Sequence, residues 1–274
     1  MSVVTISYGS SDIRKNIADS VARLLGYKLI GREILEEAAK RYNVAESKLS
    51  HAIHHGPTFF GMSETTRKKY ISYILAIASE SLLQNEIVYH GPAGHIIAQG
   101  ISHVLRVHLV SSSESRIAYT MDQNNLSREF AEQVVEKENI DRKKWSNIAF
   151  GINDDAEDIY DLLICGSQIG VKNTIDQIVN AAREKKYKPM TYSMQCIRNK
   201  ELSYRIKALL IDIDQNVDIK CDNGNVTVSA SLLASEKNKK QKIIQKRLEE
   251  IDDVEHIKMN IVDDMFDRDV GIMR

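Results

Sequence analysis

Residues 6–26 read ISYGSSDIRKNIADSVARLLG and indicate the fold class of this chain. The apolar run that leads into them, Val3 to Ile6, has the character of a buried strand, and Gly9 opens a turn. Apolar residues then recur at helical spacing: Ile13, Ile17, Val21, Leu24 and Leu25. The order of strand, glycine turn and helix predicts an α/β sheet whose turn, at the carboxyl end of the strand, faces a ligand.

The same turn has the layout of a phosphate-binding loop with altered residues. Against the template Gly-x-x-x-x-Gly-Lys-Ser/Thr, Gly9 and Lys15 fall in register. Arg14 replaces the second glycine, and Asn16 replaces the hydroxyl that holds magnesium. Asp12 also puts a carboxylate where backbone N–H groups would cradle a phosphate. The predicted nucleotide-contacting residues are Gly9, Ser10, Ser11, Lys15 and Asn16.

The composition predicts a globular cytoplasmic protein of about two domains. The chain has 274 residues, of which 43% are hydrophobic and 27% charged. Lys and Arg number 37 against 38 Asp and Glu, so the formal charge of −1 gives no reason to expect nucleic acid as a partner. The three cysteines are scattered and in no CxxC spacing, which argues against a disulfide scaffold or a zinc ribbon.

Residues 1–188 alternate short apolar runs with helical stretches, which predicts a parallel sheet flanked by helices. The expected strands are Val3–Ser7, Tyr27–Ile30, Ile87–His90, Leu105–Val110 and Leu162–Cys165. The expected helices are Ile13–Leu25, Arg32–Arg41, Ala45–Ile53, Glu64–Gln84, Glu114–Met121, Ser127–Trp145 and Val171–Glu184. The first domain is therefore assigned to residues 1–188.

The pattern changes after Lys188-Pro189. We expect a linker at 189–198, then a small α/β sandwich at 199–262 with the order helix, strand, strand, helix, strand. Asp222-Asn223-Gly224-Asn225 supplies hairpin turn residues between its first two strands. Residues 263–274 are charged, show little periodicity, and are expected to form a tail.

Four passages of the first domain keep the order and spacing of a known kinase family. They are the strand, turn and helix at Val4–Gly26, GYKLIGREILEEAA at Gly26–Ala39, EIVYHGPAGHIIA at Glu86–Ala98, and DLLICGSQIGVKNTIDQI at Asp161–Ile178. Through them the chain resembles the cytidylate-kinase-like branch of the P-loop nucleotide kinases. That resemblance implies phosphoryl transfer from ATP with Mg²⁺ to a nucleoside monophosphate or another small acceptor.

The resemblance also implies roles for particular residues. Lys15 would contact the donor phosphates, and Arg32 would contact the acceptor phosphate. The run Arg142, Lys143 and Lys144 would close over the donor as the basic cluster of a lid, although an exposed helix end is an equal alternative. Tyr70 could line an acceptor-base pocket, although helix packing is the simpler interpretation. We assign no metal ligand.

Three departures from the family predict weak or absent catalysis. The phosphate loop has Ser11-Asp12-Ile13-Arg14-Lys15-Asn16 where relatives have a glycine-rich run. Gly31 stands where relatives have an aspartate before the Arg-Glu pair, and Pro92 stands where an arginine would face phosphate. Each change removes a group that phosphate or metal binding uses.

The C-terminal segment resembles a BON domain from about Asn199 to Val262. The helix and strand order and the turn at Gly224 and Val226 match that family, whereas Ala230 stands where a glycine is usual. Such domains bind membranes or macromolecules, so the expected ligand is a protein or a membrane surface. The run Lys237, Lys239, Lys240 and Lys242 would suit an anionic surface, but a solvated helix start explains it as well.

Two functional hypotheses follow. In the first, the chain is a weak or inactive nucleotide kinase, a pseudokinase that senses a nucleotide or acts as a scaffold through its BON-like module. In the alternative, it is an active ATP-dependent phosphotransferase on a nucleoside monophosphate or other small acceptor. ATP and Mg²⁺ are the cofactors of the active form only, and a homo-oligomer is compatible with both hypotheses.

Overall fold

The computed structural model describes residues 2–8, 13–54, 62–150 and 159–264. Within these ranges it describes only the backbone of residues 8, 13–15, 54, 141–150, 167, 263 and 264. In this part of the chain, no helix combines the length and the apolar content that a membrane span needs.

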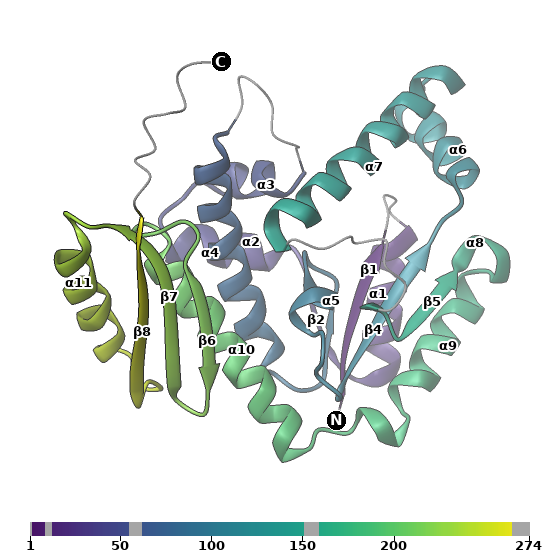
Figure 1. Ribbon diagram of the computed structural model, residues 1–274. Coiled ribbons are helices and arrows are strands. Elements are labelled where there is room, and N and C mark those ends of the chain that lie inside the picture. The colour runs from purple at the N-terminus through teal and green to yellow at the C-terminus, as the bar shows by residue number, and fades with distance from the viewer. Residues whose placement is uncertain (1, 9–12, 55–61, 151–158, 265–274) are drawn as a thin grey trace.

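The first domain is built on a five-stranded parallel sheet in the order β2-β3-β1-β4-β5 (Figure 1). Its strands are β1 (Val3–Tyr8), β2 (Lys28–Ile30), β3 (Ile87–Tyr89), β4 (Val104–Val110) and β5 (Leu162–Cys165). In register, Val3 of the central strand pairs with Ile87 of β3 on one side and with Val104 of β4 on the other. The predicted α/β fold class and the predicted strands are confirmed, with ends that differ by one residue at most.

Helices cover both faces of this sheet because the strand residues alternate between two cores. Val4 and Ile6 contribute to the core under α1 (Ile13–Leu25) and α9 (Val171–Ala182). Val3 and Tyr89 face the other core, whose helices are α2 (Glu33–Arg41), α3 (Glu46–His54), α4 (Glu64–Leu82) and α5 (Gly94–Ile97). The α4 helix is buried nearly all round, and Ser63 caps its start by accepting a hydrogen bond from Thr66 N.

Two helices, α6 (Ser113–Asn124) and α7 (Arg128–Phe150), form a hairpin above the carboxyl edge of the sheet (Figure 1). Ser112 caps α6, and Asn125 ends it in the left-handed conformation with φ 51°. The hairpin has a small core of its own around Ile117, Ala131 and Val135. The α7 helix also contacts α3 and α4, so the hairpin spans the cleft side of the sheet.

The C-terminal unit is a three-stranded mixed sheet with two helices on one face. Its elements are α10 (Thr191–Leu210), β6 (Asp218–Asp222), β7 (Asn225–Leu233), α11 (Lys237–Glu249) and β8 (His256–Asp264). Two short elements precede it in the chain, the helix α8 (Gly166–Ile169) and the 3-10 turn η2 (Lys185–Tyr187). β7 pairs antiparallel with β6 and parallel with β8. The predicted hairpin turn is confirmed, since Asn223 and Gly224 have φ of 47° and 76°, as a two-residue turn of this kind requires.

Two boundaries differ from the sequence-based expectation. Residues 191–198, expected to be a linker, are the first turns of α10, because Ser193 and Ile197 pack inside the first domain. Asp263 and Asp264, expected to begin a tail, end β8, because they pair with Leu232 and Leu233 of β7. The rest of the expected tail, 265–274, lies outside the described residues.

Candidate functional site

The chain changes direction at β1, which makes the carboxyl end of that strand the expected ligand-binding edge. From β1 the chain first goes to β2 and β3 on one side, then crosses to β4 and β5 on the other. In open parallel sheets, ligands bind outside the carboxyl ends of the strands at such a point. The loop from β1 to α1 leaves from this place, and its residues 9–12 lie outside the described part of the chain.

The predicted nucleotide-contacting residues follow β1 in the sequence and are only partly described. Gly9, Ser10 and Ser11 lie outside the described residues. Lys15 is in the first turn of α1, where only its backbone is described, and Asn16 next to it is exposed. The phosphate-binding role of these residues remains a prediction.

A stack of three aromatic rings lies beside the end of β1. The ring of Tyr160 lies between the rings of His95 and His108, at centroid distances of 5.0 and 4.6 Å. His108 Nδ1 is 3.1 Å from Ser7 Oγ, two residues before the loop begins, and the Ser7 hydroxyl lies 3.3 Å from Val107 O, to which it donates. The stack fixes the chain that enters β5 against the end of β1. Sequence reasoning missed it because its members are 12 or more residues apart in the chain and have no shared motif.

The turn from β3 to α5 is held tightly against Tyr89. This side chain is fully buried and donates a hydrogen bond from its hydroxyl to Pro92 O at 2.8 Å. A Cβ on Gly91 or Gly94 would lie 2.6 or 2.5 Å from the tyrosine side chain, so both positions need glycine. Burial raises the pKa of Tyr89, and the charge of Glu33 raises it further. The hydroxyl is therefore a structural donor.

A side chain that follows the neighbouring strand leaves no space for a Cβ at position 31. A Cβ there would lie 2.2 Å from His90 Nε2, because the imidazole lies over the Gly31 backbone. His90 N also donates to Ile30 O at 2.8 Å and extends the pairing of β3 with β2. Gly31 and His90 are thus matched in shape at the carboxyl ends of adjacent strands.

The two predicted acceptor-side residues occupy different surroundings. The Arg32 side chain is 79% exposed and forms an ion pair with Glu46 of α3, with 2.9 Å between Nη2 and Oε1. Tyr70 is half-buried, and its ring packs at 6.5 Å from the ring of Tyr73. Neither contact involves the loop after β1, and the acceptor-binding roles of Arg32 and Tyr70 remain predictions.

The hairpin carries the predicted lid residues in its longer helix. Arg142, Lys143 and Lys144 lie in α7, and their side chains are outside the described part of the chain.

Two other arginines of the hairpin form contacts within it. Arg128 bonds both Glu114 oxygens, at 2.8 and 2.7 Å, and Arg116 bonds Glu138 at 3.1 Å and Asn139 at 2.5 Å. Arg116 and Arg128 therefore join α6 to α7.

The described residues at the carboxyl edge include serine hydroxyls but no cluster of carboxylates. Magnesium in kinases is held by hydroxyl and carboxylate oxygens. The residues that follow β3 are His90 and Gly91, and those that follow β4 are Ser111 and Ser112. Among the described residues, no group of three or more His, Cys, Asp or Glu side chains is placed to hold a metal ion.

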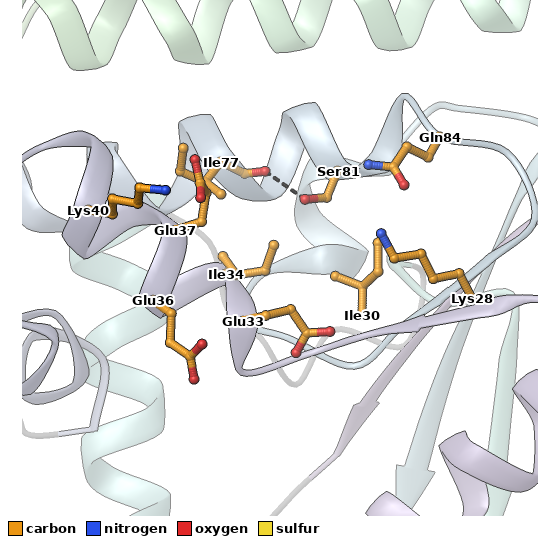
Figure 2. Close-up of a pocket in the computed structure, with 10 residues that line it drawn as sticks. All are labelled: Lys28, Ile30, Glu33, Ile34, Glu36, Glu37, Lys40, Ile77, Ser81 and Gln84. Atoms are coloured by element: carbon orange, nitrogen blue, oxygen red, sulfur yellow. Dashed lines mark hydrogen bonds between the residues drawn. The ribbon is translucent and has the colours of Figure 1, made fainter.

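A shallow pocket of about 360 Å³ lies elsewhere, between β2, α2 and α4 (Figure 2). Its floor consists of Ile30, Ile34 and Ile77, and its rim carries Lys28, Lys40, Gln84 and glutamates of α2. Lys28 begins β2 and Gln84 precedes β3, so the pocket extends toward the amino ends of the strands. It is not part of the edge where the loop after β1 begins.

The parallel sheet, the strand-loop-helix start and the helical hairpin above the carboxyl edge define a P-loop kinase-like α/β protein. The model of the cytidylate kinase-like family matches residues 3–168, which is more than half of the chain. The chain therefore belongs to the cytidylate kinase-like family. This finding confirms the kinase-like identification of the first domain.

Solved structures resemble the chain only distantly. An uncharacterized protein from Eubacterium ventriosum is 13% identical, with a TM-score of 0.48 over 66% of this chain and 97% of that one. Shikimate kinase from Bacteroides thetaiotaomicron is 7% identical, with a TM-score of 0.44 over 67% and 99% of the two chains. Shikimate kinase from Acinetobacter baumannii, in complex with shikimate, is 13% identical, with a TM-score of 0.43 over 69% and 96%. Likeness of this strength carries no argument about substrate. No curated protein sequence matches the chain.

Proposed function

We propose that this protein is a weak or inactive nucleotide kinase of its family, with a degraded phosphate loop, and that it acts as a nucleotide sensor or as a scaffold through its C-terminal unit. The observation that carries this proposal is the composition of the carboxyl edge. A kinase holds magnesium and the transferred phosphate with oxygen ligands and free cations. The described edge offers His90 and Gly91 after β3 and the hydroxyls of two serines after β4, without a cluster of carboxylates. Two arginines of the hairpin, Arg116 and Arg128, bond acidic partners.

A thermal-shift panel of nucleotides, with and without Mg²⁺, tests the proposal. We expect little or no shift with ATP and no dependence on magnesium. For comparison, saturation at 100 times the dissociation constant would stabilise a protein by about 2.7 kcal/mol, which a melting scan detects. A clear magnesium-dependent shift at micromolar ATP would contradict the proposal that the kinase is weak or inactive.

A loop variant tests whether the predicted phosphate loop is the binding site. Asp12→Gly with Arg14→Gly restores backbone freedom and removes the misplaced carboxylate, so nucleotide affinity should rise. The matched control is Asp19→Gly with Arg23→Gly on the exposed face of α1, where the two residues form an i,i+4 ion pair. If neither double variant gains affinity, the loop after β1 is not the phosphate site.

The alternative is an active phosphotransferase, and the retained hairpin favours it. The basic run of Arg142, Lys143 and Lys144 is part of α7 and directly precedes Trp145, the only tryptophan of the sequence. If the hairpin closes on a nucleotide, Trp145 emission should change on binding. Calorimetric binding with unchanged emission would remove the support for a lid role. Turnover of ATP with a nucleoside monophosphate, lost in Lys15→Met, would establish the active alternative.

For the C-terminal unit we propose a BON-like binding role at an anionic surface. Support comes from its helix, strand, strand, helix, strand order and from α11, where Lys239 and Lys242 are exposed. Binding to vesicles containing anionic lipid should fall with salt and with Lys239→Glu plus Lys240→Glu. Absence of vesicle binding at low salt would favour a protein partner.

A further inference from the structure

One helix, α10, contributes both to a core of the first domain and to the core of the C-terminal unit. Its amino-terminal half carries Ile197, which is fully buried among the residues that cover the sheet of the first domain. Its carboxyl-terminal half carries Leu202, Ile206 and Leu210, which belong to the core of the C-terminal unit. The helix is continuous from Thr191 to Leu210, so no flexible connection separates the two cores.

The carboxyl-terminal half of α10 also packs along α4 (Figure 1). Tyr73 and Ala76 of α4 form a buried cluster with Ala208 and Ile211. The Tyr73 ring stacks on Tyr42 at the end of α2, with 3.9 Å between centroids and 1° between planes. These residues, which we call the seam, therefore connect α2, α4 and α10.

Polar contacts cross the same seam at its edges. Lys69 Nζ is 2.7 Å from Asp212 Oδ1, and Lys68 Nζ is 3.1 Å from Asn216 Oδ1. Both acceptors lie between α10 and β6, in the C-terminal unit.

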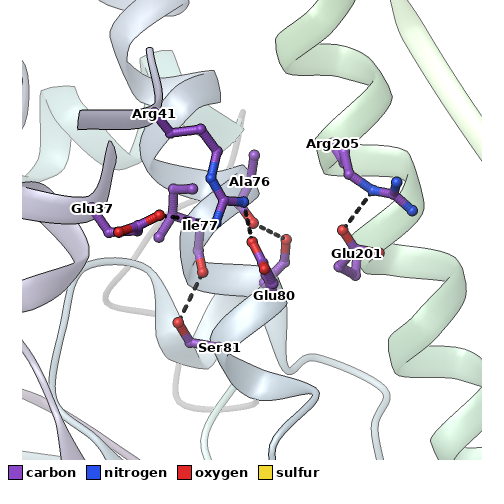
Figure 3. A network of polar contacts seen from close by, with 9 residues as sticks. Glu37, Arg41, Ala76, Ile77, Glu80, Ser81, Glu201 and Arg205 are labelled. Atoms are coloured by element: carbon purple, nitrogen blue, oxygen red, sulfur yellow. Dashed lines mark hydrogen bonds and ion pairs between the residues drawn. The ribbon is translucent and has the colours of Figure 1, made fainter. Parts of the chain in front are cut away.

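Figure 3 shows the opposite end of the seam, where Arg41 of α2 bonds Glu80 of α4 and where Glu201 and Arg205 of α10 lie nearby. Burial raises the pKa of Glu201, and the charge of Glu80 adds to this effect while Arg205 opposes it. The two helices are thus close enough for their acidic groups to interact.

A lysine of α10 reaches the turn that borders the candidate site. Lys200 Nζ donates to Ile97 O at 3.1 Å and to Gln99 O at 2.5 Å, and so binds the carboxyl end of α5. α5 begins at Gly94, in the turn that packs on Tyr89. Burial lowers the pKa of Lys200, with a further contribution from Arg106.

We propose that α10 joins the C-terminal unit to α2, α4 and α5 as one rigid body, so that these helices of the first domain move only together with the C-terminal unit. The α6–α7 hairpin has a separate small core of Ile117, Ala131 and Val135. Although α7 also contacts α3 and α4, we place the hairpin outside this body for that reason. By linkage, a ligand that shifts the C-terminal unit would also shift α2, α4 and α5 of the first domain. This proposal does not depend on nucleotide binding.

Hydrogen exchange of the full chain, measured by mass spectrometry, tests whether α10 joins the two parts as one rigid body. Ile211→Ala leaves a cavity in the seam, and amide exchange should rise by about tenfold in α4 and in β6–β8 together. Lys69→Gln, at an exposed ion pair across the seam, provides a variant that folds, with a smaller rise in the same two regions. Lys200→Met should raise exchange in residues 91–99.

The matched control is Ile117→Ala in the hairpin core, which should raise exchange in α6 and α7 alone. The proposal is overturned if Ile211→Ala and Lys69→Gln raise exchange in the C-terminal unit while α4 stays unchanged. It is also overturned if Ile117→Ala loosens α4 as much as the seam variants do.

Discussion

At the scale of single residues, His103 makes the stability of the protein depend on pH. It is fully buried, its Nδ1 is 2.9 Å from Ser193 Oγ of α10, and its Nε2 has no hydrogen-bond partner among the described residues. Burial lowers its pKa in the folded state, and the charge of the N-terminus adds to this. The unfolded chain therefore binds a proton at a higher pH than the folded chain does.

The free energy of unfolding should thus fall as the pH drops below about 6.5, the pKa of an unperturbed histidine, and change little above it. The slope from this one residue is at most about 1.4 kcal/mol per pH unit. Urea unfolding at pH 7.5, 6.5 and 5.5 measures it. His103→Gln should remove this part of the acid sensitivity, and His256→Gln, at an exposed position of β8, should leave it in place.

A second residue-scale prediction concerns the match between Gly31 and His90. Gly31→Ala should destabilise the protein by about 1 kcal/mol, the low end for overpacking, because the imidazole can turn away about its side-chain bonds. The new Cβ would otherwise lie 2.2 Å from His90 Nε2. In a His90→Ala background the same change should cost almost nothing. Equal costs in the two backgrounds, from chemical unfolding, would show that the two residues are not coupled.

Sequence could predict the residues of this region but not their contacts. Gly31 was noted as a departure from the family, yet only the structure shows that His90 lies over it. Tyr160, His95 and His108 carry no local pattern, and their stack depends on how the sheet brings distant segments together. Strands and helices were predictable because their apolar period is local, whereas side-chain contacts across the cleft are not.

At the scale of elements, α10 is the part that sequence reasoning described least well. Lys188-Pro189 and the change of pattern after it favoured a linker at 189–198. The structure has a helix from Thr191, because Ile197 and Ser193 find partners in the first domain that no local pattern reveals. The exposed connection is instead the segment around η2, where Lys185 and Lys186 are exposed.

Limited trypsin digestion should therefore cut the connection between the two units after Lys185 or Lys186 before it cuts after Arg198 or Lys200. A protease needs an extended, accessible backbone, and the turns of α10 that hold Arg198 and Lys200 are anchored by buried neighbours. Mass spectrometry of the first fragments identifies the sites. Early cleavage after Arg198 would restore the linker interpretation of 189–198.

At the scale of the whole molecule, a helix shared by two cores makes independent unfolding of the units unfavourable. Loss of the C-terminal unit would expose Tyr73 and Ala76 of α4 and would loosen α10, which also carries Ile197 into the first core. Loss of the first domain would uncover Ala208 and Ile211. Each unit thus depends on the other for part of its buried apolar surface.

We therefore expect one cooperative thermal transition for the full chain, although many proteins of this size unfold in steps. At about 0.7 kcal/mol per residue, its enthalpy near 60 °C should be about 190 kcal/mol for 274 residues. Differential scanning calorimetry measures this value, and a van't Hoff enthalpy of similar size would confirm cooperativity. Two independent units would instead give separate transitions of about 130 and 50 kcal/mol. In Ile211→Ala, where the seam is weakened, the single transition should broaden or split, whereas Ile117→Ala should leave it single, because the hairpin core lies outside the shared helix.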